Sequence, residues 1–123
     1  TIGNAYFSRR IHTDTRGFKK LLVITSAFHL PRTREIFNWI YRLTPLVHEY
    51  ELTFESVPDI GIDAKALLLR QEKENNRITS LRTLKDTIRT LPELHNWLFT
   101  EHKAYAAAPA PVHGETGEIL STY

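Results

Sequence analysis

The sequence predicts an α/β fold with a mainly parallel sheet, of which this chain contains only a part. The strongest signal is the uninterrupted apolar run LLVI at residues 21–24, which is typical of a strand covered on both faces. A segment of helical periodicity follows it, and then a segment of alternating pattern. Together they predict a βαβ unit over about residues 20–57, whose helix makes a right-handed crossover between parallel strands.

Before this unit, a helix is expected over about residues 1–12 and a turn over residues 14–17. Thr1 is suited to capping that helix by accepting a hydrogen bond from the backbone N–H of Asn4. The first strand, over about residues 20–25, should be central in the sheet and therefore needs a neighbour on each side. Because the chain offers one other clear strand, we expect an upstream segment or a second chain to complete the sheet.

Inside the unit, Pro31 favours the start of a helix that runs to about Leu43, and Pro45 should follow its end. Its apolar residues repeat at helical spacing: Ile36, Phe37, Ile40 and Tyr41. Residues 50–57 alternate between apolar and polar side chains. This alternation predicts a strand with one exposed face, at an edge of the sheet that its charges protect.

The rest of the domain is expected to be helical, over about residues 63–106. One or two helical turns around residues 64–69 should precede an amphipathic helix, and Thr90 and Glu93 have the spacing of a capping box for a last helix. The apolar faces of these two helices are expected to contain Ile78, Leu81, Leu84 and Ile88, and Leu94, Trp97, Leu98 and Tyr105, respectively. Residues 107–123 lack a periodic pattern and are expected to form a flexible tail or a partner-binding arm.

The composition excludes several classes of function. The absence of cysteine excludes a disulfide framework, a thiolate zinc site and a cysteine nucleophile. The 16 basic and 14 acidic residues are interspersed, which argues against a nucleic-acid surface. No apolar stretch approaches the roughly 18 residues of a membrane span. No metal site is expected, because His95 and His102 are seven residues apart and lack a third ligand. Since the chain also lacks methionine, we expect it to be a piece of a longer protein.

The segment TSAFHLPR, residues 25–32, contains the candidate site. Ligands of open parallel sheets bind beyond the carboxyl ends of the strands. Four residues of the segment fall there: Thr25, Ser26, His29 and Arg32. Two hydroxyls, an imidazole and a guanidinium fork beside a helix N-terminus would suit a phosphate or a carboxylate. The alternative is an ordinary strand-to-helix turn, in which the hydroxyls cap the helix and His29 bonds a carbonyl group.

Two segments, TIGNAYFSRRI and KLLVITSAFHLPRTREIF, together resemble the YdcF-like (SanA and ElyC type) domain family. In that family a Thr-x-x-Asn helix precedes an apolar strand and a Thr-Ser-x-x-His-x-x-Arg segment. The resemblance covers about the first 57 residues and implies a Rossmann-like three-layer α/β/α domain whose polar residues converge on one pocket. The matching positions are Thr1, Asn4, Ser26, His29 and Arg32. The family's first strands are absent, so we expect residues 1–106 to form the C-terminal portion of such a domain.

Two functions remain open from the sequence, which points to no particular cofactor or reaction. In the first, the chain binds a small anionic or nucleotide-like ligand and catalyses hydrolysis or group transfer, with His29 as acid or base and Arg32 stabilising charge. The residues expected to bind that ligand are Thr1, Asn4, Thr25 and Ser26. In the second, the chain is a non-catalytic accessory or structural subunit of a larger assembly, with its last helix and tail as contact surfaces.

Overall fold

The structure, a computed structural model, describes residues 1–102. The predictions for residues 103–123, which include Tyr105 and the tail, lie outside the described residues. The elements in chain order are α1 (Ile2–Phe7), the π-helical η1 (Ser8–Thr13), α2 (Asp14–Arg16), β1 (Lys20–Ser26), the 3-10 turn η2 (Ala27–His29), α3 (Leu30–Ile40), β2 (Glu51–Val57), α4 (Ala64–Thr87) and α5 (Leu91–Thr100). Helices are combined with a parallel strand pair, so the α/β class is confirmed. None of the described helices has the length and apolar character needed to cross a membrane.

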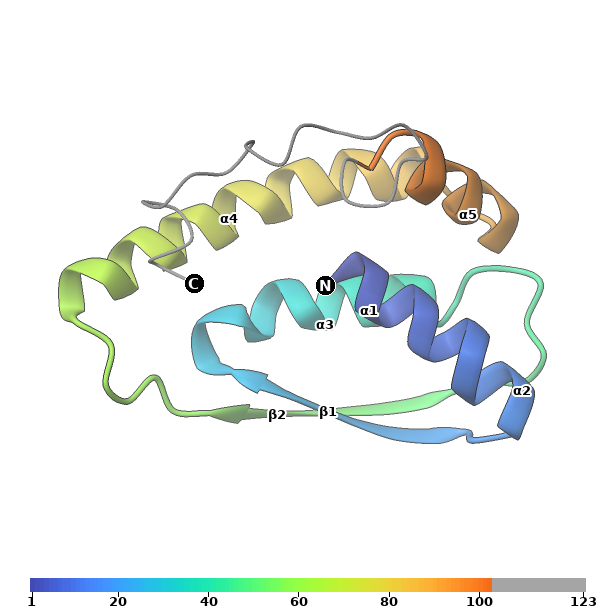
Figure 1. Ribbon diagram of the computed structural model, residues 1–123, viewed down its shortest axis with the longest axis horizontal. Helices are drawn as coiled ribbons and strands as arrows, with labels where there is room; N and C mark the ends of the chain where they lie inside the picture. The colour runs from blue at the N-terminus through green and yellow to red at the C-terminus, as the bar shows by residue number, and fades with distance from the viewer. Residues whose placement is uncertain (103–123) are drawn as a thin grey trace.

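The predicted βαβ unit is present. β1 and β2 pair in parallel over their full lengths, with Leu21 opposite Leu52 and Val23 opposite Phe54. α3 connects them in the chain and lies over the strand pair (Figure 1). Within residues 1–102 the sheet consists of these two strands, and the second edge of β1 pairs with no other strand. The described part of the chain therefore does not supply the second neighbour that the sequence predicts for β1.

In the described part of the chain, helices cover one face of this strand pair (Figure 1). Leu21 on the covered face packs against the core. Leu22 and Ile24 point to the opposite face, where they are 53% and 58% exposed. The sequence predicts a strand covered on both faces, but in the described residues one face carries no helix. The coarse α/β prediction is thus correct, whereas the three-layer arrangement is not confirmed.

The N-terminal helical run is longer than predicted. α1, η1 and α2 follow one another without a break, and Gly17 ends the run in the left-handed conformation at φ 75°. Such a conformation favours glycine. The residues predicted to turn, 14–16, are helical. Among them, Asp14 accepts from Arg9 Nε at 3.2 Å and from the hydroxyl of Tyr50, which fixes this end of the helix against the rest of the chain.

Arg9 joins this helix to the end of α3. Its side chain is completely buried and donates to the carbonyl oxygens of Ile40, Leu43 and Pro45 at 2.7, 2.8 and 2.8 Å. Carbonyl groups at a helix C-terminus have no partner within the helix, so a buried guanidinium can satisfy several of them at once. The cation therefore has a structural role at the end of the molecule opposite the candidate site.

α4 is one helix of 24 residues rather than the two shorter segments that the pattern predicts. The stretch RQEKENNR, residues 70–77, has no apolar periodicity, which is why a break was expected. Most of its residues are good helix formers, and Glu74 in its middle is buried against the rest of the fold. Asp63 caps the helix by accepting from the backbone N–H of Ala66 at 3.4 Å.

The core lies between α1, α3, the second half of α4 and α5. Thr90 caps α5 as predicted, because its hydroxyl oxygen accepts from the backbone N–H of Glu93 at 3.3 Å. Leu94 and Leu98, on the predicted apolar face of α5, are fully buried. Further core residues are Ala5, Tyr6, Ile36, Trp39, Ile40, Leu81, Ile88 and Leu91. The candidate segment 25–32 lies at the opposite end of α3 from Arg9.

Candidate functional site

Thr25 and Ser26 end β1 at the carboxyl edge of the sheet. Ser26 occupies the N-cap position of η2, yet its side chain forms no capping hydrogen bond. The N–H of Phe28 is instead satisfied by the carboxylate of Asp59, at 3.3 Å, from the loop after β2. The ordinary-turn alternative predicts that these hydroxyls cap the turn, whereas in the structure the acceptor is the carboxylate of Asp59.

His29 and Arg32 converge on one carboxylate, that of Glu74 in α4. His29 Nδ1 lies 2.8 Å from Glu74 Oε1. Arg32 donates from Nη2 to Oε1 at 3.1 Å and from Nε to Oε2. The guanidinium fork that was expected to face an anionic ligand thus faces an internal carboxylate. His29 bonds a charged side chain rather than a backbone carbonyl group.

The local fold brings these three side chains together. His29 is the last residue of η2 and Arg32 lies in the first turn of α3, three residues further on, so both lie on one helix face. Pro31 at the start of α3 has no N–H to leave unsatisfied there. α4 packs across this end of α3 and brings Glu74 against both.

The electrostatics of the cluster follow from its burial. Glu74 is only 2% exposed, so its charge needs compensation, which the adjacent guanidinium of Arg32 supplies. Burial lowers the pKa of His29 from its ordinary 6.5, the carboxylate of Glu74 opposes this change, and the charges of Arg32 and Arg77 add to it. His29 is therefore neutral at pH 7, and its side chain keeps 24% of its surface exposed.

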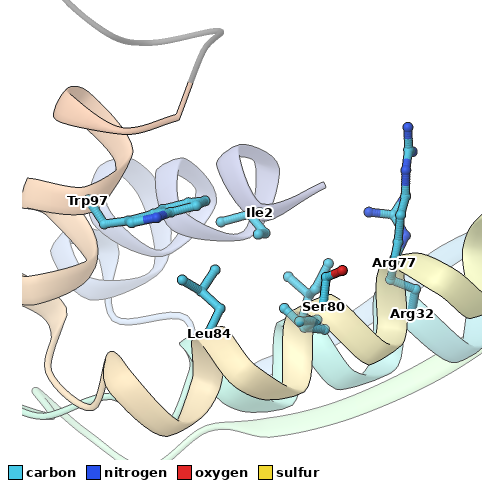
Figure 2. Close-up of a pocket in the computed structure, with 8 residues that line it drawn as sticks. Ile2, Arg32, Arg77, Ser80, Leu84 and Trp97 are labelled. Atoms are coloured by element: carbon cyan, nitrogen blue, oxygen red, sulfur yellow. The ribbon is translucent and has the colours of Figure 1, made fainter.

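A cavity of about 330 Å³ lies beside this cluster, and Arg32 is one of its lining residues. Figure 2 shows Arg32 and Arg77 at one end of the cavity and Trp97 at the other, with Ile2 and Leu84 between them. The wall is mainly apolar, and its charged groups are the two arginines. Residues 25 and 26 are not among the lining residues.

Thr1 lies near this cluster, whereas Asn4 does not contact it. Thr1 is exposed, and the next residue, Ile2, lines the cavity together with Arg32. The side chain of Thr1 forms no capping hydrogen bond, contrary to the sequence expectation. Asn4 is exposed on α1, its carbonyl oxygen accepts from Ser8 Oγ at 2.6 Å, and its side chain has no hydrogen bond with His29 or Arg32.

Sequence analysis missed Glu74 and Arg77. Both lie in the polar stretch of α4 that connects the two helical segments predicted from the sequence. The sequence does contain a signal for Glu74. It lies four residues before Ile78 and seven before Leu81, so it continues the apolar face of these two residues towards the N-terminus. A carboxylate on the buried side of a helix needs a cationic partner, and the segment 25–32 contains one.

Residues 1–102 contain no group of three or more His, Asp or Glu side chains arranged to hold a metal ion. Comparisons of the chain with protein-family models, with curated proteins and with solved structures found no match. The geometry of the cluster is therefore the basis for a functional assignment.

Proposed function

We propose that the chain binds a small anionic or nucleotide-like ligand at the carboxyl edge of the sheet, beside His29 and Arg32. Hydrolysis or group transfer with His29 as acid or base is the reaction class that this site suits. The observation that carries the proposal is the buried carboxylate of Glu74, which contacts both residues. A buried ion pair contributes little to stability by comparison with well-packed apolar residues, so a site of this kind favours a role beyond folding.

The Glu74 contact prepares His29 for proton transfer. An ionised carboxylate only accepts hydrogen bonds, so the proton of neutral His29 must sit on Nδ1, which faces Oε1 of Glu74. The basic nitrogen is then Nε2. A carboxylate that holds the tautomer and stabilises the imidazolium form is the arrangement used by catalytic histidines on many folds.

Arg32 would contact the anion through donors other than the pair directed at Glu74. Its Nε and Nη2 each donate to Glu74, and a guanidinium carries five N–H groups in total. The side-chain hydroxyls of Thr25 and Ser26 form no hydrogen bond in the described residues, so ligand oxygens could use them without breaking a structural contact. These features support ligand contacts from both ends of the candidate segment.

We further propose that β1 and β2 belong to a Rossmann-like three-layer α/β/α domain of the YdcF-like type, completed by strands and helices from an upstream segment or a second chain. The motif residues at positions 25–32 and the parallel order of the strands support this assignment. The exposed side chains of Leu22 and Ile24 also support it, because in a three-layer domain helices would cover them.

Calorimetric titration with inorganic phosphate and AMP tests the anion site. Arg32→Gln should weaken binding about ten- to hundredfold, since a charged hydrogen-bond donor is lost. Glu74→Gln should instead strengthen phosphate binding severalfold, because a competing negative charge is removed while its shape is kept. Arg82→Gln removes an exposed arginine of α4, the helix that contains Glu74. It is the matched control and should change neither the phosphate affinity nor the AMP affinity.

The double variant Arg32→Gln/Glu74→Gln controls for misfolding, because it places a neutral pair where Arg32→Gln alone leaves an uncompensated buried charge. Thermal unfolding of each variant establishes that it is folded. The proposal is wrong if neither probe binds the folded wild-type chain, or if binding is the same in wild type, Glu74→Gln and the double variant.

The exposed sheet favours a second function, that of a non-catalytic accessory or structural subunit. Leu22, Ile24 and Val57 are each more than half exposed, and apolar side chains gathered on one sheet face commonly mark a contact surface. Association that depends on these side chains, together with no binding of phosphate or AMP, would favour this function over the first.

A further inference from the structure

We propose that the cavity between α1, α3, α4 and α5 binds the apolar chain of a medium-chain aliphatic carboxylate, with its carboxylate beside Arg32 and Arg77. This inference rests on the proposed anion site, because Arg32 belongs to both. It goes further by naming the ligand class, which is a single negative charge carried on an unbranched apolar chain.

The cavity has a cationic end and an apolar end (Figure 2). Arg32 and Arg77 stand at the first and Trp97 at the second, and the side chains of Ile2 and Leu84 line the path between them. A ligand that satisfies both ends must therefore combine a negative group with an apolar body. A simple phosphate would leave most of the apolar wall in contact with water.

The inner wall is apolar and fixed. Ile36 and Leu81 line the cavity and are 0% and 4% exposed, because the core holds them on their other sides. Ser80 lies at the exposed side, where its hydroxyl already donates to the carbonyl oxygen of Asn76 at 3.4 Å. Binding of an apolar chain here would remove apolar surface from water without burying an unsatisfied polar group.

The charge of the lining selects a monoanion. No acidic residue is among the described residues that line this cavity. The contact between Arg32 and Glu74 already compensates part of the positive charge at the cationic end. A singly charged carboxylate, which a guanidinium can hold with two parallel hydrogen bonds, therefore suits this end better than a doubly charged phosphate.

The volume limits the length of the chain. A water molecule occupies roughly 30 Å³ of liquid, so about eleven such volumes would fill the cavity. Small-molecule sites range from roughly 300 Å³ upwards, and this cavity lies near the lower end. Octanoate has a suitable size, whereas a long-chain fatty acid would extend out of the cavity.

Titration of the complete chain with octanoate, butyrate and octanol tests the inference. Octanoate should bind about two-hundredfold more tightly than butyrate, because it has four more methylene groups and each buried methylene contributes roughly fourfold in affinity. Octanol has the chain without the charge and should bind more weakly than octanoate. The fluorescence of Trp97 should change on octanoate binding, and this change should be absent in Trp97→Phe.

Three variants locate the ligand. Arg77→Gln should weaken octanoate binding about tenfold or more and leave octanol binding unchanged. Ser80→Phe places a large side chain at the exposed rim and should prevent octanoate binding while the thermal unfolding transition is kept. Arg82→Gln is the control on the same helix, since Arg82 does not line the cavity, and it should bind octanoate as the wild type does.

Parallel titrations with inorganic phosphate and AMP separate this inference from the proposed function. Octanoate binding that is lost in Ser80→Phe supports the inference, whether or not phosphate or AMP binds. Phosphate or AMP binding without octanoate binding overturns the inference and leaves the proposed function standing. Failure of all the probes to bind the folded chain overturns both. Equal binding of octanoate by Arg77→Gln, Ser80→Phe and wild type also overturns the inference.

Discussion

At the scale of single residues, the role of Glu74 changes how the candidate segment is understood. The sequence predicts that Arg32 presents its fork to a ligand, but the fork contacts a carboxylate that the chain itself supplies. This carboxylate is buried, so removing Arg32 alone leaves a charge without its main partner, which typically costs about 3–5 kcal/mol. Loss of function in Arg32→Ala would therefore combine a loss of ligand binding with a loss of stability. The double variant Arg32→Gln/Glu74→Gln separates the two effects, because it leaves no uncompensated buried charge.

The stability of the chain should fall as the pH is lowered from about 6.5 towards 5. Burial lowers the pKa of His29, and the same cause lowers the pKa of His102. Between the lowered pKa and the ordinary value of 6.5, the unfolded chain binds more protons than the folded chain, so acidification favours unfolding. Above about pH 6.5 both states are neutral at these sites, and their contribution does not change.

Urea unfolding between about pH 5 and 8 measures this dependence, in a range where carboxylates with ordinary pKa values stay ionised. His29→Gln keeps an amide donor for Glu74 and should flatten the slope, and His29→Gln/His102→Gln should flatten it further. His12→Gln, at an exposed position, is the control and should keep the slope of the wild type. An unchanged slope in His29→Gln would contradict the assignment to His29.

At the scale of secondary-structure elements, the sequence predicts β1, β2, α3 and α5 well because each carries its own signal. The LLVI run, the alternating pattern of residues 50–57 and Pro31 are local features that tertiary contacts did not override. For α4 the sequence pattern predicts two separate helical segments, because residues 70–77 are polar. The continuity of the helix depends on helix propensity and on partners far away in the sequence. Because the same long-range contacts bring Glu74 and Arg77 to the candidate segment, the sequence pattern did not place these two residues at the candidate site.

The capping contact of α5 gives a test at this scale. Thr90→Ala should lower the free energy of unfolding by about 1 kcal/mol, because the backbone N–H of Glu93 loses its acceptor. Thr90→Asp should retain most of the stability. Thr79→Ala is the control in the exposed interior of α4, where alanine is the better helix former, and it should be neutral or slightly stabilising. Chemical denaturation of the three variants measures these differences, and equal losses in Thr90→Ala and Thr79→Ala would exclude a capping role.

At the scale of the whole molecule, the helices and the strand pair differ in how completely they are covered. The helical core has several side chains with no exposed surface, such as Ile36 and Leu94. The sheet has two strands in residues 1–102 and one bare face. Sequence pattern detected this imbalance as a missing neighbour for β1, since a fully apolar strand is expected inside a sheet. The pattern of one strand could not specify which residues would pair with it, because strand pairing also depends on residues outside that strand.

The purified chain should therefore associate through β1 as its concentration rises. Within residues 1–102 the outer edge of β1 pairs with no strand, and Leu22 and Ile24 add exposed apolar surface next to it. Leu22→Lys/Ile24→Lys should abolish association and change the free energy of unfolding by no more than about 0.5 kcal/mol, since both side chains are more than half exposed.

Leu68→Lys, at a position of α4 that is 63% exposed, is the control and should associate as the wild type does. Sedimentation velocity measures the association. Hydrogen exchange should show that the protection of the β1 amides rises with concentration in the wild type but not in the double variant. Equal association in the two lysine variants, or a monomeric wild type whose outer β1 amides stay unprotected, would show that this edge of the sheet is stable in water and needs no further strand.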